Sequence, residues 1–444
     1  MKILAITAGA ANMYCGSCLR DNALATELRR QGHDVTLVPI YTPTRTDEPN
    51  VSEKRVLYGG VNVYLQQTVP LFRRTPKFID RVFDSKWVMQ VLSKISVSTD
   101  PAKLAELTVS TLKGEHGFQK KEVRKLTDWL KAQPTPDVIV LPNSLMIGLA
   151  LPLARALKVP VVCTLQGEDL FLDGLPASHR AEALELIREQ VEHVDAFIAV
   201  SDYYADFMGK LLAIPPEKMT MVPIGINFDG YQPGEPSEGP LKIGYFARIA
   251  PEKGLHNLVE AYRLLRERND LPATRLEVAG YLGREHRDYL AKAESDMRRY
   301  GLGDEFHYHG VLDRREKIEF LRSLAVVSVP TDYEEPKGIF LLEAMAAGTP
   351  VVQPRRGAFA EIVEKTGGGL IVDANDPAAL AETLARLCLD ASERRELGRR
   401  GFEGVRRHYS VADMARQSVA VFEKLGAREP VSEKQQVETG AVTV

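Results

Sequence analysis

Two glutamates in the second half of the chain, Glu335 and Glu343, have a spacing that suits a sugar nucleotide. Pro336 and Gly338 follow the first and fit a tight turn, and helix formers run from 339 to 347. Glu335 is therefore expected in the loop before a helix and Glu343 on its second turn. Between them lie the free N–H groups of the helix N-terminus, which suit a phosphate. Because a carboxylate can accept two hydrogen bonds from a vicinal diol, the pair predicts a phosphate carrying a sugar at each end.

Arg248 and Lys253 can supply the positive charge that such a phosphate needs. The stretch 241–247 predicts a strand, and Pro251 suits the first turn of a helix. Both cations then follow a strand end, where open α/β sheets bind ligands. They can hold a diphosphate and stabilise the charge that grows as it leaves. Alone, such cations are more often ordinary surface residues; only beside the glutamate pair do they indicate a site.

With these segments in view, the chain resembles the family-four (group 1) retaining glycosyltransferases of the GT-B fold over most of residues 1–425. The segment 332–352 is specific for that family, and weaker matches lie at 1–6, 27–37, 194–201 and 222–227. The resemblance implies an α/β protein whose two Rossmann-like doubly wound domains face each other across a cleft.

The same resemblance implies roles for two groups of residues. The catalytic group is Glu335 on the donor hexose, Arg248 and Lys253 on the donor phosphates, and Gln166 in the first domain. The donor-binding group is Gly16, Gly338, Ile339, Phe340 and Glu343, with Glu343 on the nucleotide ribose. No metal and no other cofactor is expected, because Arg and Lys neutralise the phosphates and no Asp-x-Asp motif stands where a metal would bridge them.

Two positions depart from the family pattern. Gln166, within 164–169, stands where the family usually has a histidine beside the donor sugar, and Lys337 stands where it usually has an aromatic residue. Glutamine can donate and accept hydrogen bonds but does not titrate near neutral pH. If the histidine acts by position, Gln166 is an adequate substitute. If proton transfer matters, activity would be impaired or the acceptor unusual.

A Cys-x-x-Cys pair, Cys15 and Cys18, lies between the first strand and the first helix. The favoured interpretation is a packed loop with incidental thiols, which by resemblance lines the interdomain cleft. One alternative is a redox-sensitive loop, because a helix N-terminus lowers a thiol pKa. Another is half of a zinc site with His33 or His116, although no second Cys-x-x-Cys exists. Four unevenly spaced cysteines do not make a disulfide scaffold.

Composition indicates a soluble protein of two domains. The chain has 444 residues, 44% of them hydrophobic and 26% charged, and its net charge of −3 makes no case for nucleic acid. No run approaches the roughly 18 apolar residues of a membrane span. Met1 and Lys2 lead straight into a strand rather than a signal peptide, so the expected location is the cytoplasm.

Alternating strand and helix patterns place the domain boundaries. We expect an acceptor-side domain over 1–230, with a helical insertion at about 71–131, and a nucleotide-sugar-binding domain over 241–408. A Pro- and Gly-rich linker over 231–240 joins them. A helix over 409–425 crosses back to the first domain by resemblance, and a disordered tail is expected over 426–444. Further strands are expected at 137–141, 159–163, 196–200, 276–280, 306–309, 325–329 and 369–372.

The segment 71–131 is basic within an acidic chain. It holds thirteen Lys or Arg and seven Asp or Glu, and apolar residues recur at helical spacing over 71–92. The plain interpretation is a solvated helix on the first domain. The alternative is a face for a phosphorylated, acidic or lipid-linked acceptor, or a peripheral contact through 71–92 with the inner membrane face.

The expected reaction is transfer of a hexosyl group from a nucleoside-diphosphate sugar to an acceptor hydroxyl, with retention implied by the resemblance. UDP-, GDP- and ADP-linked donors are all compatible, and the acceptor is a carbohydrate or a lipid-linked molecule. A glycogen- or starch-synthase-like glucosyltransferase is an alternative, although no lysine occurs in the first loop, 7–15. A sugar-phosphate or disaccharide synthase of the family, a non-catalytic sugar-nucleotide-binding protein and a thiol oxidoreductase also stay open.

Overall fold

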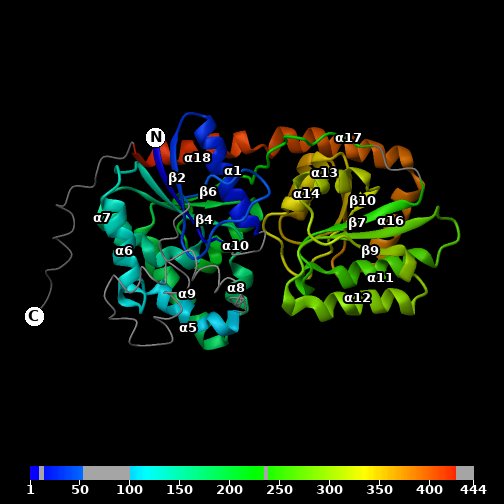
Figure 1. Ribbon diagram of the computed structural model, residues 1–444, viewed down its shortest axis with the longest axis horizontal. Coiled ribbons are helices and arrows are strands. Elements are labelled where there is room, and N and C mark those ends of the chain that lie inside the picture. Colours follow the sequence, from blue (N-terminus) through cyan, green and yellow to red (C-terminus); the bar gives the residue numbers. More distant parts are fainter. Residues whose placement is uncertain (10–14, 54–100, 235–238, 427–444) are drawn as a thin grey trace, which may run out of the picture.

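The chain forms two six-stranded parallel sheets, each covered by helices on both faces (Figure 1). The computed structural model describes residues 1–9, 15–53, 101–234 and 239–426. The predicted α/β architecture of two Rossmann-like domains is confirmed.

The first sheet has the strand order β2-β1-β3-β4-β5-β6. Its strands are β1 Lys2–Thr7, β2 Asp34–Pro39, β3 Val138–Leu141, β4 Val161–Leu165, β5 Ala196–Ala199 and β6 Met219–Met221. The α-helices described around it are α1 Gly16–Arg30, α5 Pro101–Leu112, α6 Lys120–Lys131, α7 Ala150–Leu157, α8 Asp169–Asp173, α9 Ala177–Gln190 and α10 Asp202–Leu212.

The second sheet has the order β12-β11-β10-β7-β8-β9. Its strands are β7 Leu241–Phe246, β8 Thr274–Ala279, β9 Phe306–Tyr308, β10 Val326–Val327, β11 Val351–Pro354 and β12 Gly369–Val372. The α-helices that follow its first strand are α11 Leu255–Arg266, α12 Arg287–Arg299, α13 Arg314–Ser323, α14 Ile339–Ala346, α15 Phe359–Thr366, α16 Pro377–Leu389, α17 Ala391–His408 and α18 Val411–Gly426. Short 3₁₀ turns are η2 Gly114–His116, η3 Ser144–Leu149, η4 Val191–His193, η5 Pro216–Lys218, η6 Pro251–Lys253, η7 Arg284–His286 and η8 Gly303–Glu305.

Continuous apolar runs form the inner strands because helices cover both sheet faces. Every residue of β3 and of β4 is buried, and β1 pairs in parallel with both β2 and β3. The predicted strands lie within two residues of these positions. β6 was not predicted as a separate strand, since its three residues, Met-Thr-Met, carry little strand signal.

The last two helices run along one side of both domains (Figure 1). α17 packs on α14, α15 and α16 of the second domain, whereas α18 packs on α1 of the first. The Gln31 side-chain amide donates to the Ala412 carbonyl at 3.2 Å. The chain therefore crosses twice between its two domains.

Some of the predicted segments lie outside the described residues. In the basic segment, 101–131 forms α5 and α6, but 71–92 is outside, as is the tail 427–444. Within the described ranges, no helix is long and apolar enough to span a bilayer.

Candidate active site between the two domains

The loops that follow β7 and β10 meet because these two strands are neighbours in the second sheet. Gly254 has φ +71, and a Cβ there would lie 1.8 Å from the Pro330 carbonyl oxygen, so the close approach requires glycine. Its left-handed backbone also separates η6 from α11. The predicted helix start at Pro251 is therefore wrong: Pro251 begins a 3₁₀ turn, and the α-helix begins at Leu255.

This approach brings together Lys253, Tyr333 and Glu335. Lys253 Nζ lies 2.6 Å from Glu335 Oε2 and 2.6 Å from the Tyr333 hydroxyl. The Tyr333 hydroxyl also donates to Glu335 Oε2. The ammonium stands 5.5 Å from the centre of the Phe340 ring, within the range of a cation–π contact. Two residues predicted to act on one donor thus form one charge-paired unit.

Glu335 is buried rather than open to solvent. The residue is only 3% exposed. Burial alone would raise the pKa of its carboxyl, but Lys253 and Tyr333 outweigh burial and hold that pKa at about 2. Burial lowers the pKa of Lys253, and the carboxylate of Glu335 opposes that shift. The site therefore holds a desolvated ion pair, whose fields are stronger than those of a surface pair.

Glu335 also binds the backbone just before the helix that follows it. Its Oε1 accepts from the backbone N–H groups of Lys337 at 3.2 Å and Gly338 at 3.3 Å. Gly338 has φ +59 and is the residue before the first turn of α14. The Gly338 N–H that we expected to face a phosphate therefore faces Glu335, and a bound phosphate would have to share or replace this contact.

Arg248 stands apart from the buried pair. It pairs with Glu252 one turn further on, and its side chain is 36% exposed. This position leaves the guanidinium accessible to a ligand at the mouth of the site. The Arg248 carbonyl accepts from the buried Tyr245 hydroxyl at 3.3 Å, which ties the loop to β7.

Gln166 follows β4 of the first domain and is 2% exposed. Its side-chain amide donates to the Pro142 carbonyl at 2.7 Å and to Asp21 Oδ1 at 3.3 Å, while its backbone N–H donates to Glu168 Oε2 at 2.8 Å. Its Oε1 is buried and has no partner among the described residues. Gln166 can thus accept one further hydrogen bond, whereas its donors are already engaged.

Asp169 begins α8 three residues after Gln166, and the sequence did not single it out. Burial raises the pKa of its carboxyl to about 6, although the Tyr204 hydroxyl donates to it at 2.7 Å. Its charge contributes to raising the pKa of Tyr333 in the other domain. The sequence shows a carboxyl group at this position, but only its burial in the folded chain makes it titrate near neutral pH.

Direct contacts close the gap between the domains at this point. The Ser201 hydroxyl donates to the Pro336 carbonyl at 2.9 Å, and Lys337 Nζ donates to the Ser17 hydroxyl at 3.1 Å. A Cβ added to Gly16 would lie 3.3 Å from Ile339 Cδ1. Gly16 and Ile339, both predicted donor-binding residues, thus face each other. The departure at Lys337 also has a structural consequence, because its ammonium reaches Ser17 of the first domain.

Cys15 and Cys18 open α1 beside the same gap, and both are free thiols. A hydrogen bond from Cys18 lowers the pKa of Cys15 well below that of an ordinary thiol; burial opposes the shift and the charge of Lys337 adds to it. The pKa of Cys18 is raised by the same hydrogen bond and by burial. Across the described ranges, no three His, Cys, Asp or Glu residues gather as metal ligands would.

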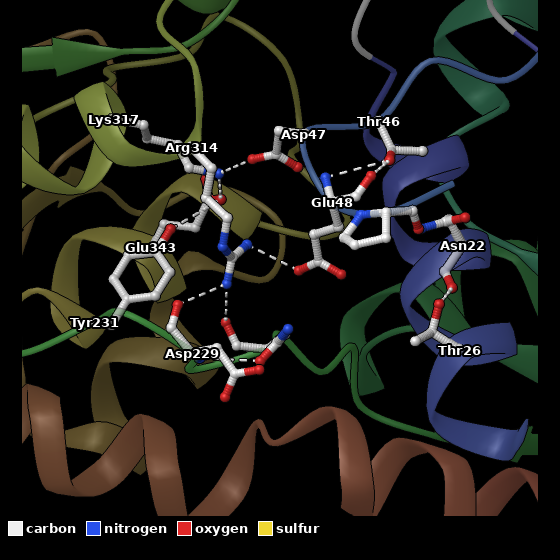
Figure 2. A network of polar contacts seen from close by, with 12 residues as sticks. Asn22, Thr26, Thr46, Asp47, Glu48, Asp229, Tyr231, Arg314, Lys317 and Glu343 are labelled. Carbon is white, nitrogen blue, oxygen red and sulfur yellow. Dashed lines mark hydrogen bonds and ion pairs between the residues drawn. The ribbon is translucent and has the colours of Figure 1, made fainter. Parts of the chain in front are cut away.

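Glu343 lies one turn further along α14, within an ionic network that the sequence did not predict (Figure 2). Lys317 Nζ is 2.6 Å from Glu343 Oε1 and also pairs with Asp47 of the first domain. The Tyr231 hydroxyl donates to the same Glu343 oxygen at 3.3 Å. Neither Lys317 nor Asp47 stands in a recognisable motif, so no local signal would have found them.

Both halves of the chain match glycosyltransferase families. Residues 21–225 match the family described as Glycosyl transferase 4-like domain, and residues 231–404 match the family described as Glycosyl transferases group 1.

Individual relatives and a solved structure are also similar to this chain. The chain is 32% identical over 236 residues to an MMP alpha-(1->4)-mannosyltransferase of Mycolicibacterium hassiacum, covering 52% of this chain and about half (53%) of that relative. It is 27% identical over 307 residues to a D-inositol 3-phosphate glycosyltransferase of Frankia alni, covering 65% of this chain and 71% of the relative. The structure of Anabaena HepE in complex with UDP and glucose superposes with a TM-score of 0.67 at 17% identity, over 96% of this chain and 100% of the other. With its two Rossmann-like domains and a family match in each half, this chain belongs to the group 1 glycosyltransferases of the GT-B fold.

Proposed function

We propose that the protein moves a hexosyl group from a nucleoside-diphosphate sugar to an acceptor hydroxyl, with retention at the anomeric carbon and without a metal ion. The donor diphosphate lies on Arg248, Lys253 and the N-terminus of α14. Glu335 contacts the hexose and Glu343 the ribose. Closure against the first domain excludes water that would otherwise hydrolyse the donor.

One observation carries this proposal: the buried pair of Lys253 and Glu335 at the N-terminus of α14. A buried lysine beside a helix N-terminus can stabilise charge on a departing diphosphate, with little reorganisation of its surroundings. Glu335 keeps its negative charge at neutral pH because its pKa is about 2, so it accepts hydrogen bonds from sugar hydroxyls. HepE, which has the same fold, was crystallised with UDP and glucose, and this supports the class of donor proposed here.

A thermal-shift screen over UDP-, GDP- and ADP-sugars tests donor binding and identifies the base. A true ligand at about 100 times its dissociation constant stabilises the protein by about 2.7 kcal/mol. Release of the nucleoside diphosphate in the presence of an acceptor then separates an enzyme from a binding protein. Stabilisation by a nucleotide sugar without any release would favour the binding protein.

Two further measurements test the finer parts of the proposal. Turnover that is unchanged after treatment with EDTA supports a reaction that needs no metal, and loss of turnover that Mg²⁺ or Mn²⁺ restores contradicts it. The anomeric configuration of the first product, measured by proton NMR, distinguishes retention from inversion.

The class of acceptor is proposed from the net positive charge of one segment of the first domain. The basic segment 71–131 favours a phosphorylated, acidic or lipid-linked acceptor, or a peripheral contact with an anionic membrane. Co-sedimentation with vesicles containing anionic lipid, at low and high salt, tests membrane contact. If no binding appears at low salt and neutral sugars serve as well as anionic ones, the charge has neither role.

A further inference from the structure

We propose that Lys317 is a positioning residue: it holds the Glu343 carboxylate in the orientation that receives the donor ribose. This inference rests on the proposed function, because it takes a nucleotide as the ligand of Glu343. It adds a residue of α13 to the site and links ribose recognition to a contact between the two domains.

Lys317 lies on the first turn of α13, with its side chain directed at two carboxylates (Figure 2). Its Nζ is 2.6 Å from Glu343 Oε1, and Asp47 approaches from the loop after β2. The Lys317 side chain is only 6% exposed. Burial would lower the pKa of Lys317, but Glu343 and Asp47 outweigh burial and raise it. The ammonium is therefore charged and fixed in place.

This contact leaves one side of the Glu343 carboxylate available. Lys317 and the Tyr231 hydroxyl both engage Oε1. No hydrogen bond or ion pair of the described residues uses Oε2. A carboxylate anchored through one oxygen presents the other in a defined direction, which lowers the entropy cost of binding a hydroxyl. Glu343, Tyr231 and Asp47 also line a pocket between the domains, together with Ile339 and Asn22.

Stability alone gives a weak reason for such an arrangement. A buried ion pair is seldom more stable than apolar residues of the same volume. Here one lysine serves two carboxylates, one from each domain, and one of the two is the predicted ribose ligand. Because Asp47 reaches Lys317 only when the domains are together, the lysine that orients Glu343 is itself held by closure.

A neighbouring ion pair provides a matched control. Arg314 Nη1 lies 2.8 Å from Glu48 Oε1 and crosses between the same two elements. Its Nη2 donates to the backbone carbonyls of Asn227 and Asp229, and among the described residues it forms no hydrogen bond or ion pair with Glu343 (Figure 2). Breaking this pair removes an interdomain contact while leaving Glu343 with its lysine.

Isothermal titration of the full chain with UDP, GDP and ADP, and with the 2′-deoxy form of each, tests the inference. The measured quantity is the ratio of the dissociation constants of the deoxy and ribose forms. For the wild type we expect a ratio of about ten, the scale of one hydrogen bond to a charged group. Glu343→Gln and Lys317→Met should both bring the ratio below about three, and the double variant should lose no more than either alone. Glu48→Gln should keep the wild-type ratio.

The outcomes separate the two proposals. If none of the three diphosphates binds, the proposed function fails and this inference fails with it. If one binds and Lys317→Met keeps the wild-type ratio, the inference alone is overturned and Lys317 only joins the domains. A loss of discrimination in Glu48→Gln equal to that in Lys317→Met also overturns it. Should Lys317→Met not fold, Asp47→Asn combined with Lys317→Met removes one of the two carboxylates that the lysine had paired, and the same ratio decides.

Discussion

Lys253 Nζ and Glu335 Oε2 lie 2.6 Å apart although 82 positions separate the two residues along the chain. The pair joins the loops after β7 and β10, and Tyr333 completes it. Since both groups are buried, each is the other's main counter-charge. Substitution of either residue therefore affects chemistry and stability together.

Lys253→Met should lower turnover at saturating donor by about a hundredfold, or roughly 3 kcal/mol, because one charged contact to the leaving diphosphate is lost. It should also lower stability, since Glu335 is left as an unpaired buried charge, at a cost of about 3–5 kcal/mol. Steady-state kinetics and thermal unfolding check both effects. Lys210→Met, which breaks an exposed pair on α10, serves as the control. Normal turnover in Lys253→Met would remove this lysine from the site.

Stability should fall in acid through Glu335. Its folded-state pKa is about 2, below the ordinary value of 4.5. A depressed folded pKa stabilises the fold above pH 4.5, and that contribution disappears as pH falls from about 4.5 towards 2. The full shift corresponds to roughly 3 kcal/mol. The unfolding temperatures of wild type and Glu335→Gln should therefore converge as pH falls from about 4.5 to 2, and a constant difference over that range would contradict the assignment.

Gln166→Ala should lower turnover, whereas Gln166→His should be tolerated. The alanine variant loses the free Oε1 acceptor and leaves Asp21, whose pKa burial already raises, without its amide donor. A histidine can replace both a donor and an acceptor. Turnover and unfolding temperature of the two variants are compared. Full activity in Gln166→Ala would show that the side chain does not touch the reacting groups.

Glu343→Gln should act mainly on donor affinity. Ribose contacts differ little between ground state and transition state, so KM should rise while kcat changes little. Steady-state kinetics with the donor identified in the screen gives both constants. An equal fall in kcat and kcat/KM would instead place Glu343 among the groups that act only in the transition state.

Cys15 should be the first cysteine to react with iodoacetamide at pH 7. Its pKa is lowered, so the thiolate is populated at a pH where an ordinary thiol is mostly protonated. Cys18, Cys163 and Cys388 are buried, and burial raises the pKa of each. Peptide mass spectrometry after brief labelling identifies the modified site. Lys337→Met should slow the reaction because it removes a positive charge; labelling of Cys18 at the same rate would contradict this prediction.

Sequence alone determined the architecture and the two glutamates on either side of the start of α14. Apolar runs bounded by turn residues predict buried parallel strands, and the Pro-x-Gly turn and the helix formers up to Gly348 bound one short helix. These signals act over a few residues, so they can be recognised without knowing the fold. The start of α11 was missed, because the left-handed backbone at Gly254 is set by the approach of Pro330 from another loop.

Tertiary structure alone decided the partners of the predicted residues. Glu335 is buried only in the folded chain. Lys317 bridges Glu343 and Asp47, and Lys337 donates to Ser17; both contacts join segments far apart in sequence. The sequence around a charged residue does not show which opposite charge that residue will contact in the folded chain. That pairing, and with it the pKa of each group, is set by desolvation and distance once the two domains have come together.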